Sequence, residues 1–387
     1  MKIPLKYNVR NLLVRRTSTA MTVLGIAAVV AVFIGLNALS RGLQEAFVTS
    51  GEPENLIVLR EGAQVETNSA ITREGLHIIR YLDGIATAEG GEPLVSPEVV
   101  VLVNLRRRAD NEPVNVLVRG VSPAGYALRR GLRVVAGRPP RPGRRELMAS
   151  RTMAARFQNL GPGEQVRLAK SHWTVVGLFD AGRSAFASEI WGDALEIADE
   201  FDRRDFSSVL LGTSGPAAQG AIVRRIRDDR RLHLKALAEP AYYDEQTKSA
   251  APIKVLGTFI ATLMAIGACF AVMNTMYAAV AWRGREIATL QVLGFPRRSI
   301  LASFLVESLI LAAAGGAIGC VLALPIHGVS TGTANWRTFS EVVFAFRITP
   351  DLLARGFLFA LGMGTLGGIL PARLAARQAI VRTLRAI

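Results

Sequence analysis

Cysteine and lysine are scarce in this 387-residue sequence, and each scarcity excludes a class of protein. Both cysteines, Cys269 and Cys320, lie inside long apolar runs, so the polar part of the chain has no disulfide framework. Each of the six lysines follows a residue other than glycine, so the Gly-Lys pair of the Walker A phosphate-binding loop is absent. The chain therefore does not hydrolyse ATP by that loop.

Short catalytic motifs are also missing. The four histidines (His77, His172, His233 and His327) are scattered, and none belongs to an H-E-x-x-H arrangement. No G-x-S-x-G sequence is present either. We therefore expect the chain itself to be non-catalytic, with no catalytic, cofactor-binding or metal-binding residues.

The positive charge is concentrated beside apolar segments. Residues 1–16, 283–298 and 373–387 together carry thirteen basic residues and one acidic residue, which accounts for +12 of the net +15. The stretch 41–254 has 30 basic and 27 acidic residues, a net of only +3. A nucleic-acid-binding protein would carry a continuous basic stripe. Basic flanks beside apolar runs are typical of cytoplasmic loops in membrane proteins, so we expect a membrane partner and no nucleic acid.

Four apolar segments are long enough to span a bilayer. Residues 17–40 contain no charge over 24 positions, and as a helix they would exceed the ~30 Å hydrocarbon core. A cleaved signal peptide is the alternative for this segment, but the apolar region is too long and no clear cleavage site follows. The other predicted spans are 255–282, 299–324 and 352–372.

The basic flanks predict one topology. Residues 1–16 form a cytoplasmic amphipathic helix on the membrane surface, or else a disordered basic leader. Residues 283–298 form a cytoplasmic helix, and 373–387 form a cytoplasmic tail. The large segment 41–254 and the loop 325–351 then lie on the periplasmic side. We expect an α-helical membrane protein with four transmembrane helices and a large extracytoplasmic domain between the first two.

Residues 41–254 predict a folded α/β domain. Strand–helix–strand order occurs near each end, with strands 55–59, 99–104, 207–212 and 232–237 and helices 72–82 and 217–231. The predicted α/β part covers about 41–120 and 206–250. Residues 121–205 are richer in proline, glycine and arginine and predict a β-rich insertion. The triple arginine 106–108 is expected at an exposed hairpin end, with binding of anionic lipid or an acidic partner as the alternative.

The segment REIATLQVLGFPRRSI, residues 285–300, predicts a short helix between two spans. Ile287, Leu290 and Leu293 fall roughly on one face, and Gly294 and Pro296 end this helix and begin the next. Such a helix can dock on a cytoplasmic motor and relay force, or it can rest on lipid headgroups.

Five further residues inside the spans attract notice. The pairs Gly315/Gly319 and Gly364/Gly368 have the four-residue spacing that lets membrane helices pack closely, although glycine is common in these segments. Glu307 is costly within lipid, so we expect it to face protein or water and to form a structural hydrogen bond.

Several stretches resemble the membrane permease family that includes MacB, LolC/LolE and FtsX. The resemblance is strongest in MNTMYAAVAWRGREIATLQVLGFPRRSILASFLVESLILAAAGGAIG (273–319). It extends to NVRNLLVRRTSTAMTVLGIA (8–27) and GGILPARLAARQAIVRTLRAI (367–387). GRPPRPGRRELMASRTMAARF (137–157) and WTVVGLFDAG (173–182) resemble the family's periplasmic core domain.

The resemblance implies the permease subunit of a mechanotransmission-type ABC transporter in a bacterial inner membrane. It implies a dimer, expected to be a homodimer, with ATP and Mg²⁺ bound by a separate cytoplasmic ATPase. A periplasmic adaptor or carrier protein is a further expected partner. The segment 283–298 would be the coupling helix, in which Arg285, Glu286, Ile287, Leu290, Leu293 and Gly294 contact the ATPase. The cargo would be a lipid, lipoprotein, peptide or hydrophobic compound.

Two other functions stay open at this point. An FtsX-like regulator would use the same ATPase cycle to activate a periplasmic cell-wall hydrolase without transport. A membrane-embedded enzyme would need a polar catalytic pair near the spans, and only Glu307 has the right chemistry.

Overall fold

The computed structural model describes residues 5–247, 251–335 and 337–377. They divide into two units. The helical unit comprises the described residues within 1–41, 252–329 and 346–387, and the sheet unit those within 42–251 and 330–345.

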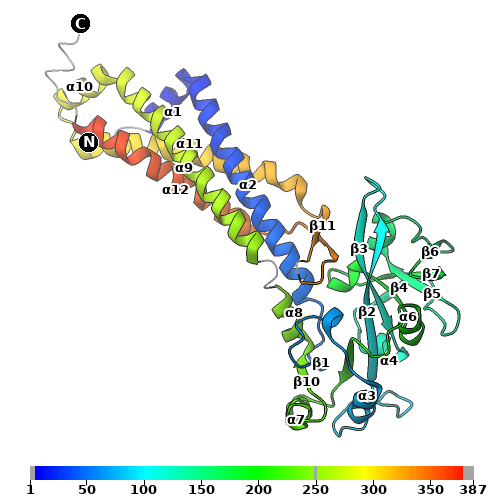
Figure 1. The fold of residues 1–387 in the computed structure, drawn as a ribbon. Helices are drawn as coiled ribbons and strands as arrows, with labels where there is room; N and C mark the ends of the chain where they lie inside the picture. The colour runs from blue at the N-terminus through cyan, green and yellow to red at the C-terminus, as the bar shows by residue number, and fades with distance from the viewer. Residues whose placement is uncertain (1–4, 248–250, 336, 378–387) are drawn as a thin grey trace. The chain divides into compact units, whose positions relative to one another are not determined.

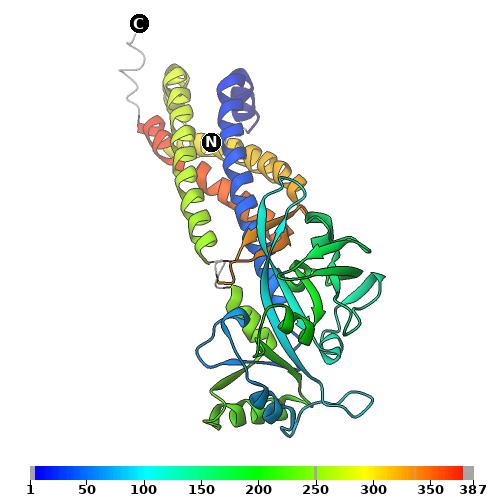
Figure 2. The same cartoon turned by 45° about the vertical axis from the view of Figure 1, so that its right-hand side comes forward.

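Four helices of the chain are long and apolar enough to cross a membrane, counted over the described residues. They are α2 (Arg16–Val48), α9 (Ala251–Trp282), α11 (Arg297–Ala323) and α12 (Pro350–Arg377). The short helices α1 (Leu5–Val14) and α10 (Gly284–Val292) and the 3₁₀ turn η4 (Leu324–Ile326) accompany them. Figures 1 and 2 show these helices gathered in one bundle.

The observed helices are longer than the predicted spans. α2 begins at Arg16 and continues to Val48, beyond the predicted end at residue 40. α12 runs from Pro350 through Arg377, so residues 373–377, predicted as tail, are helical. Charge and proline marked the expected ends, but a helix continues into polar surroundings wherever its backbone bonds are kept. Residues 1–4 and 378–387 of the predicted terminal segments lie outside the described residues.

The sheet unit is built on ten strands with the order β10-β1-β9-β2-β3-β8-β5-β7-β4, and β6 pairs with β7. The strands are β1 (Asn55–Arg60), β2 (Val95–Arg106), β3 (Pro113–Val121), β4 (Arg133–Gly137), β5 (Glu146–Ser150), β6 (Gln165–Arg167), β7 (His172–Asp180), β8 (Glu189–Asp193), β9 (Ser208–Gly212) and β10 (Leu234–Ala238). The pairs β3–β8 and β5–β7 are parallel, and the others are antiparallel.

Helices cover this sheet and connect its strands. They are α3 (Arg73–Arg80), α4 (Pro123–Ala127), α5 (Arg151–Arg156), α6 (Ala194–Glu200), α7 (Pro216–Asp228) and α8 (Glu239–Thr247), with the 3₁₀ turns η1 (Glu66–Asn68) and η2 (Ala185–Ser188). Thr72 caps α3 by accepting a hydrogen bond from the Gly75 amide. Ile222 and Ile226 of α7 are buried, as the four-residue spacing predicts.

The predicted division of 41–254 into an α/β part and a separate β-rich insertion is wrong in one respect. Residues 121–205 do contain β4 to β8, but they also form α4, α5 and α6. Their strands continue the same sheet, because β8 pairs directly with β3. The long strands β2 and β3, drawn in cyan in Figure 2, pair with each other, and β2 also pairs with β9.

A buried ion cluster lies where these parts meet. Arg119 on β3 donates hydrogen bonds to Glu66 (2.6 Å), Glu98 (2.7 Å) and Glu189 (2.8 Å), and its side chain is 2% exposed. Arg129 also binds Glu98, at 2.6 Å. The two arginines lower the pKa of Glu98 although burial opposes the change. Each of these five charged side chains has an oppositely charged partner, and the Arg119 contacts link β2, β3, β8 and η1.

The loop predicted at 325–351 is in part a β-hairpin. β11 (Ser330–Ala334) pairs with β12 (Glu341–Ala345), and both strands belong to the sheet unit. Glu341 is 3% exposed and accepts hydrogen bonds from Arg107 (3.1 Å) and Arg156 (2.5 Å). The hairpin is stabilised by these partners, which lie far away in the sequence, so no local pattern predicts it.

Candidate functional site

The short helix α10 (Gly284–Val292) lies between α9 and α11 and ends in a tight turn. The Gly294 amide donates to the Gln291 carbonyl (3.1 Å), and the Phe295 amide donates to the Leu290 carbonyl (3.0 Å). Gly294 has φ +85°, which a residue with a Cβ rarely adopts. This pair of bonds is the Schellman arrangement, so the chain reverses within two residues without losing backbone hydrogen bonds.

One face of α10 packs inside the helical unit, which corrects the predicted docking face. Ile287 is 1% exposed and belongs to the apolar core with Ile300 and Phe304. It is therefore not available to a partner in this structure. Leu290 is half-buried, and Leu293 is 64% exposed.

Val292 is 65% exposed beside Leu293, and the sequence analysis missed it. The sequence pattern predicted one apolar face that includes Ile287, but Ile287 packs inside the helical unit. The exposed apolar end of α10 therefore consists of Val292 and Leu293, with Arg285 exposed on the same helix.

A buried ion pair joins α10 to α11. Arg283, which precedes α10, donates to Glu307 at 3.0 Å, and their side chains are 10% and 3% exposed. The Arg283 guanidinium also lies 5.2 Å from the centre of the Phe304 ring. Glu307 thus has the structural partner expected of a carboxylate within a span.

The same arginine connects to α1. Arg283 donates to Glu286 at 3.0 Å, and the Tyr7 hydroxyl donates to the same Glu286 oxygen at 2.7 Å. The Tyr7 hydrogen bond and the nearby Arg283 lower the pKa of Glu286. The carboxylate of Glu286 is therefore engaged within this chain, although its side chain is 55% exposed.

Sequence reasoning did not identify Arg283 or Tyr7. Arg283 was grouped with the basic flank that orients the spans, and Tyr7 falls in a basic leader. The available signal was Glu307 itself, because a lone carboxylate within an apolar helix requires a cationic or polar partner nearby.

The four glycines named from the sequence lie where helices approach closely. A Cβ on Gly315 or Gly319 would come within 2.7 Å of the Cβ of Ile26 or Val30 on α2. A Cβ on Gly364 or Gly368 of α12 would come within 2.4 Å of Ala312 or 2.1 Å of Ser308 on α11. Side chains at these positions would force the helices apart.

The triple arginine lies at the end of the β2–β3 hairpin, as predicted. Arg107 binds Asp110 (2.6 Å) as well as Glu341, and Arg108 donates to the Phe157 carbonyl (2.7 Å). These two side chains are thus used in internal contacts. Across the described ranges, no group of three or more His, Cys, Asp or Glu side chains could hold a metal ion.

Comparison with known families matches both units. Residues 19–229 match the MacB-like periplasmic core domain, and residues 258–380 match the FtsX-like permease C-terminal domain.

Curated relatives are similar along most of the chain. The macrolide export ATP-binding/permease protein MacB of Azoarcus sp. (strain BH72) is 26% identical over 391 residues, covering 93% of this chain and 56% of that protein. The MacB protein of Hahella chejuensis (strain KCTC 2396) is 24% identical over 390 residues, covering 94% of this chain and 57% of that protein. This chain thus spans somewhat more than half the length of these relatives.

Solved structures resemble part of the chain. The periplasmic region of MacB from Actinobacillus actinomycetemcomitans has 12% identity and a TM-score of 0.38, and covers 49% of this chain and 90% of that one. The extracellular domain of the noncanonic ABC-type transporter YknZ from Gram-positive bacteria has 18% identity and a TM-score of 0.36, with coverage of 47% and 99%.

The match to the MacB-like core domain extends over more than half of the chain, and the predicted fold class and family resemblance are both confirmed. This chain belongs to the family of ABC permeases that combine a MacB-like periplasmic core domain with an FtsX-like permease domain.

Proposed function

We propose that this chain is the transmembrane permease subunit of a mechanotransmission-type ABC transporter in a bacterial inner membrane. It couples ATP hydrolysis by a partner ATPase, which binds ATP and Mg²⁺, to movement of its periplasmic domain. The movement serves export or extraction of a lipid, lipoprotein, peptide or hydrophobic compound. Membership in the MacB/FtsX-like family and the α10 arrangement support this proposal.

The exposed apolar end of α10 is the observation that carries the proposal. Val292 and Leu293 are 65% and 64% exposed at the end of α10. Ile287 of the same helix is buried in the apolar core of the helical unit. Exposed apolar side chains next to an interfacial turn favour burial against a partner protein. We assign them, together with Arg285, as the surface that contacts the ATPase.

Force applied to this surface has a stiff route into the spans. The Schellman turn after α10 and the Arg283–Glu307 pair both connect α10 to α11. α11 packs closely on α2 at Gly315 and Gly319. α2 is one continuous helix of 33 residues, about 50 Å long, which exceeds the ~30 Å apolar layer of a bilayer.

The basic residues around α10 support a cytoplasmic location for this helix. Arg283, Arg285, Arg297 and Arg298 lie within or beside the helix, as expected of a cytoplasmic loop. The same topology puts the N- and C-termini in the cytoplasm and the sheet unit in the periplasm. A second permease copy, most simply a homodimer, and a periplasmic adaptor or carrier complete the proposed assembly.

The test is to place a charge on the apolar end of α10. The double variant Val292→Asp, Leu293→Asp should abolish stimulation of the partner ATPase and co-purification with it. Leu195→Asp is the control for an aspartate at an exposed apolar position, because Leu195 is 60% exposed in the sheet unit. The control should retain both activities; full stimulation in the double variant would refute the coupling surface.

The same preparation tests the regulatory alternative. Export of cargo into or out of proteoliposomes supports the transporter. Activation of a cell-wall hydrolase by the sheet unit, without any cargo movement, would replace it with an FtsX-like regulator.

A further inference from the structure

The pairing along one edge of strand β2 is interrupted. Residues 95–98 of β2 pair with β9 on this edge, and the opposite edge of residues 99–106 pairs with β3. The Ser207 hydroxyl accepts from the Val100 amide at 3.0 Å, which ends the pairing with β9. Beyond it, the Gln158 amide donates to the Arg106 carbonyl at 3.1 Å.

Two residues between these contacts present free backbone groups. In an antiparallel pair the amide and carbonyl of alternate residues point away from the partner strand. Since Val100 and Arg106 bond away from β3, Leu102 and Asn104 point the same way. Among the described residues, no hydrogen bond joins the amide or carbonyl of Leu102 or Asn104 to another group. This stretch is called the β2 window below.

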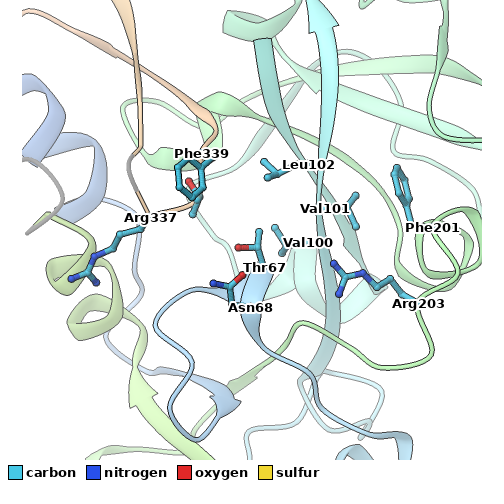
Figure 3. Close-up of a pocket in the computed structure, with 10 residues that line it drawn as sticks. Thr67, Asn68, Val100, Val101, Leu102, Phe201, Arg203, Arg337 and Phe339 are labelled. Atoms are coloured by element: carbon cyan, nitrogen blue, oxygen red, sulfur yellow. The ribbon is translucent and has the colours of Figure 1, made fainter. Parts of the chain in front are cut away.

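A groove of about 440 Å³ opens at the β2 window. Its lining includes Val100, Leu102, Phe201, Arg203 and Phe339. Figure 3 shows Phe201 and Arg203 on one side of β2 and Phe339 on the other. Phe339 is 67% exposed and Leu102 is 36% exposed, so the groove offers apolar surface as well as backbone donors and acceptors.

The charged residues that line the groove are all positive. Its lining contains two arginines, Arg203 and Arg337, and no acidic residue. Neither arginine forms an ion pair with any described residue, and Nη1 of Arg337 is buried without a hydrogen-bond partner. An occupant with carboxylates would therefore meet complementary charge.

We propose that the β2 window is a docking site for an extended, acidic segment of a partner protein, which adds a short strand to the sheet. Unpaired strand edges are templates for strand addition, and the backbone groups supply the affinity while the groove selects side chains. Val100 and Arg106 are six residues apart, roughly 20 Å at ~3.4 Å per residue, which leaves room for four or five residues. This site does not depend on the proposed ATPase contact.

The experiment uses the full chain in phosphatidylcholine nanodiscs and a pool of blocked, randomised pentapeptides as the probe. Retained peptides are identified by mass spectrometry, and amide hydrogen exchange is followed at β2. We expect retained peptides to be enriched in Asp and Glu. The Leu102 and Asn104 amides should exchange quickly alone and at least tenfold more slowly with the retained peptides.

Two variants test the backbone and the charge separately. Leu102→Pro removes one free amide and should weaken retention at least tenfold, because that amide faces the window and not β3. Leu102→Val keeps the amide and should stay within twofold of the wild type. Arg203→Glu leaves the backbone unchanged, so it tests the site even if the proline variant does not fold. Because the new carboxylate offsets the charge of Arg337, this variant should lose the preference for acidic peptides.

The proposal is overturned if no peptide is retained, if the folded Leu102→Pro variant retains peptides as the wild type does, or if the two amides gain no protection. Arg203→Glu with an unchanged acidic preference would also overturn it. Displacement of bound peptides by phosphatidylglycerol, with equal lipid binding by the wild type and Leu102→Pro, would identify a lipid site instead.

Discussion

Replacing Arg283 with methionine should destabilise the helical unit more than neutralising its partner Glu307. Arg283→Met removes the only cation within hydrogen-bonding distance of Glu307 among the described residues, leaving a carboxylate that is 3% exposed. Orphaning one partner of a buried ion pair costs about 3–5 kcal/mol of the free energy of unfolding. At the 3.0 Å separation of the pair, an effective dielectric constant of ~20 gives an attraction of about 5.5 kcal/mol, close to the upper end of that range.

Glu307→Gln, in contrast, leaves Arg283 with a charged partner. Arg283 keeps its 3.0 Å contact with Glu286, whose side chain is 55% exposed, so the guanidinium remains paired. The amide oxygen of glutamine can still accept one hydrogen bond from Arg283. The cost should then be that of weakening one charged hydrogen bond, about 1–3 kcal/mol.

The measurement is unfolding of the purified full chain in mixed micelles by titration with sodium dodecyl sulfate. The single variant Glu307→Leu and the double variant Arg283→Met, Glu307→Leu complete a cycle with Arg283→Met, and the double variant should recover about 2 kcal/mol or more relative to Arg283→Met alone. Equal losses in both single variants, or strict additivity in the double variant, would show that the pair does not connect α10 to α11 as argued.

Three further predictions concern other contacts. Burial raises the pKa of Glu239 to about 7, so the folded state favours the protonated carboxyl. The free energy of unfolding should therefore fall by about 3 kcal/mol as the pH rises from 4.5 to 7. Glu239→Gln should remove this pH dependence in urea titrations. Gly364→Val should lower the melting temperature because its Cβ would lie 2.4 Å from that of Ala312, whereas Gly362→Val, with open space around it, should not. Glu341→Gln should cost about 1–3 kcal/mol by weakening the bonds to two arginines, seen as earlier proteolysis of the β11–β12 hairpin.

The sequence by itself determined the features that depend on local pattern. Long charge-free runs require helices in lipid, because every backbone group must be satisfied within its own segment. The four spans, the short helix α10 and the turn at Gly294 follow from this rule and from glycine geometry. Short apolar runs likewise predicted β1, β2 and β9, and the family resemblance rests on contiguous motifs.

Only the tertiary structure decided which residues meet across the chain. Glu307 lies 24 residues from Arg283, and periodicity alone could not pair them. An apolar residue such as Ile287 can pack internally or contact a partner, and the sequence does not distinguish these roles. In the structure, Ile287 is buried in one core with Ile300 and Phe304, and Val292 and Leu293 remain exposed. The free edge at Leu102 exists because β9 ends where Ser207 contacts Val100, and strand pairing is a property of partners that are distant in sequence.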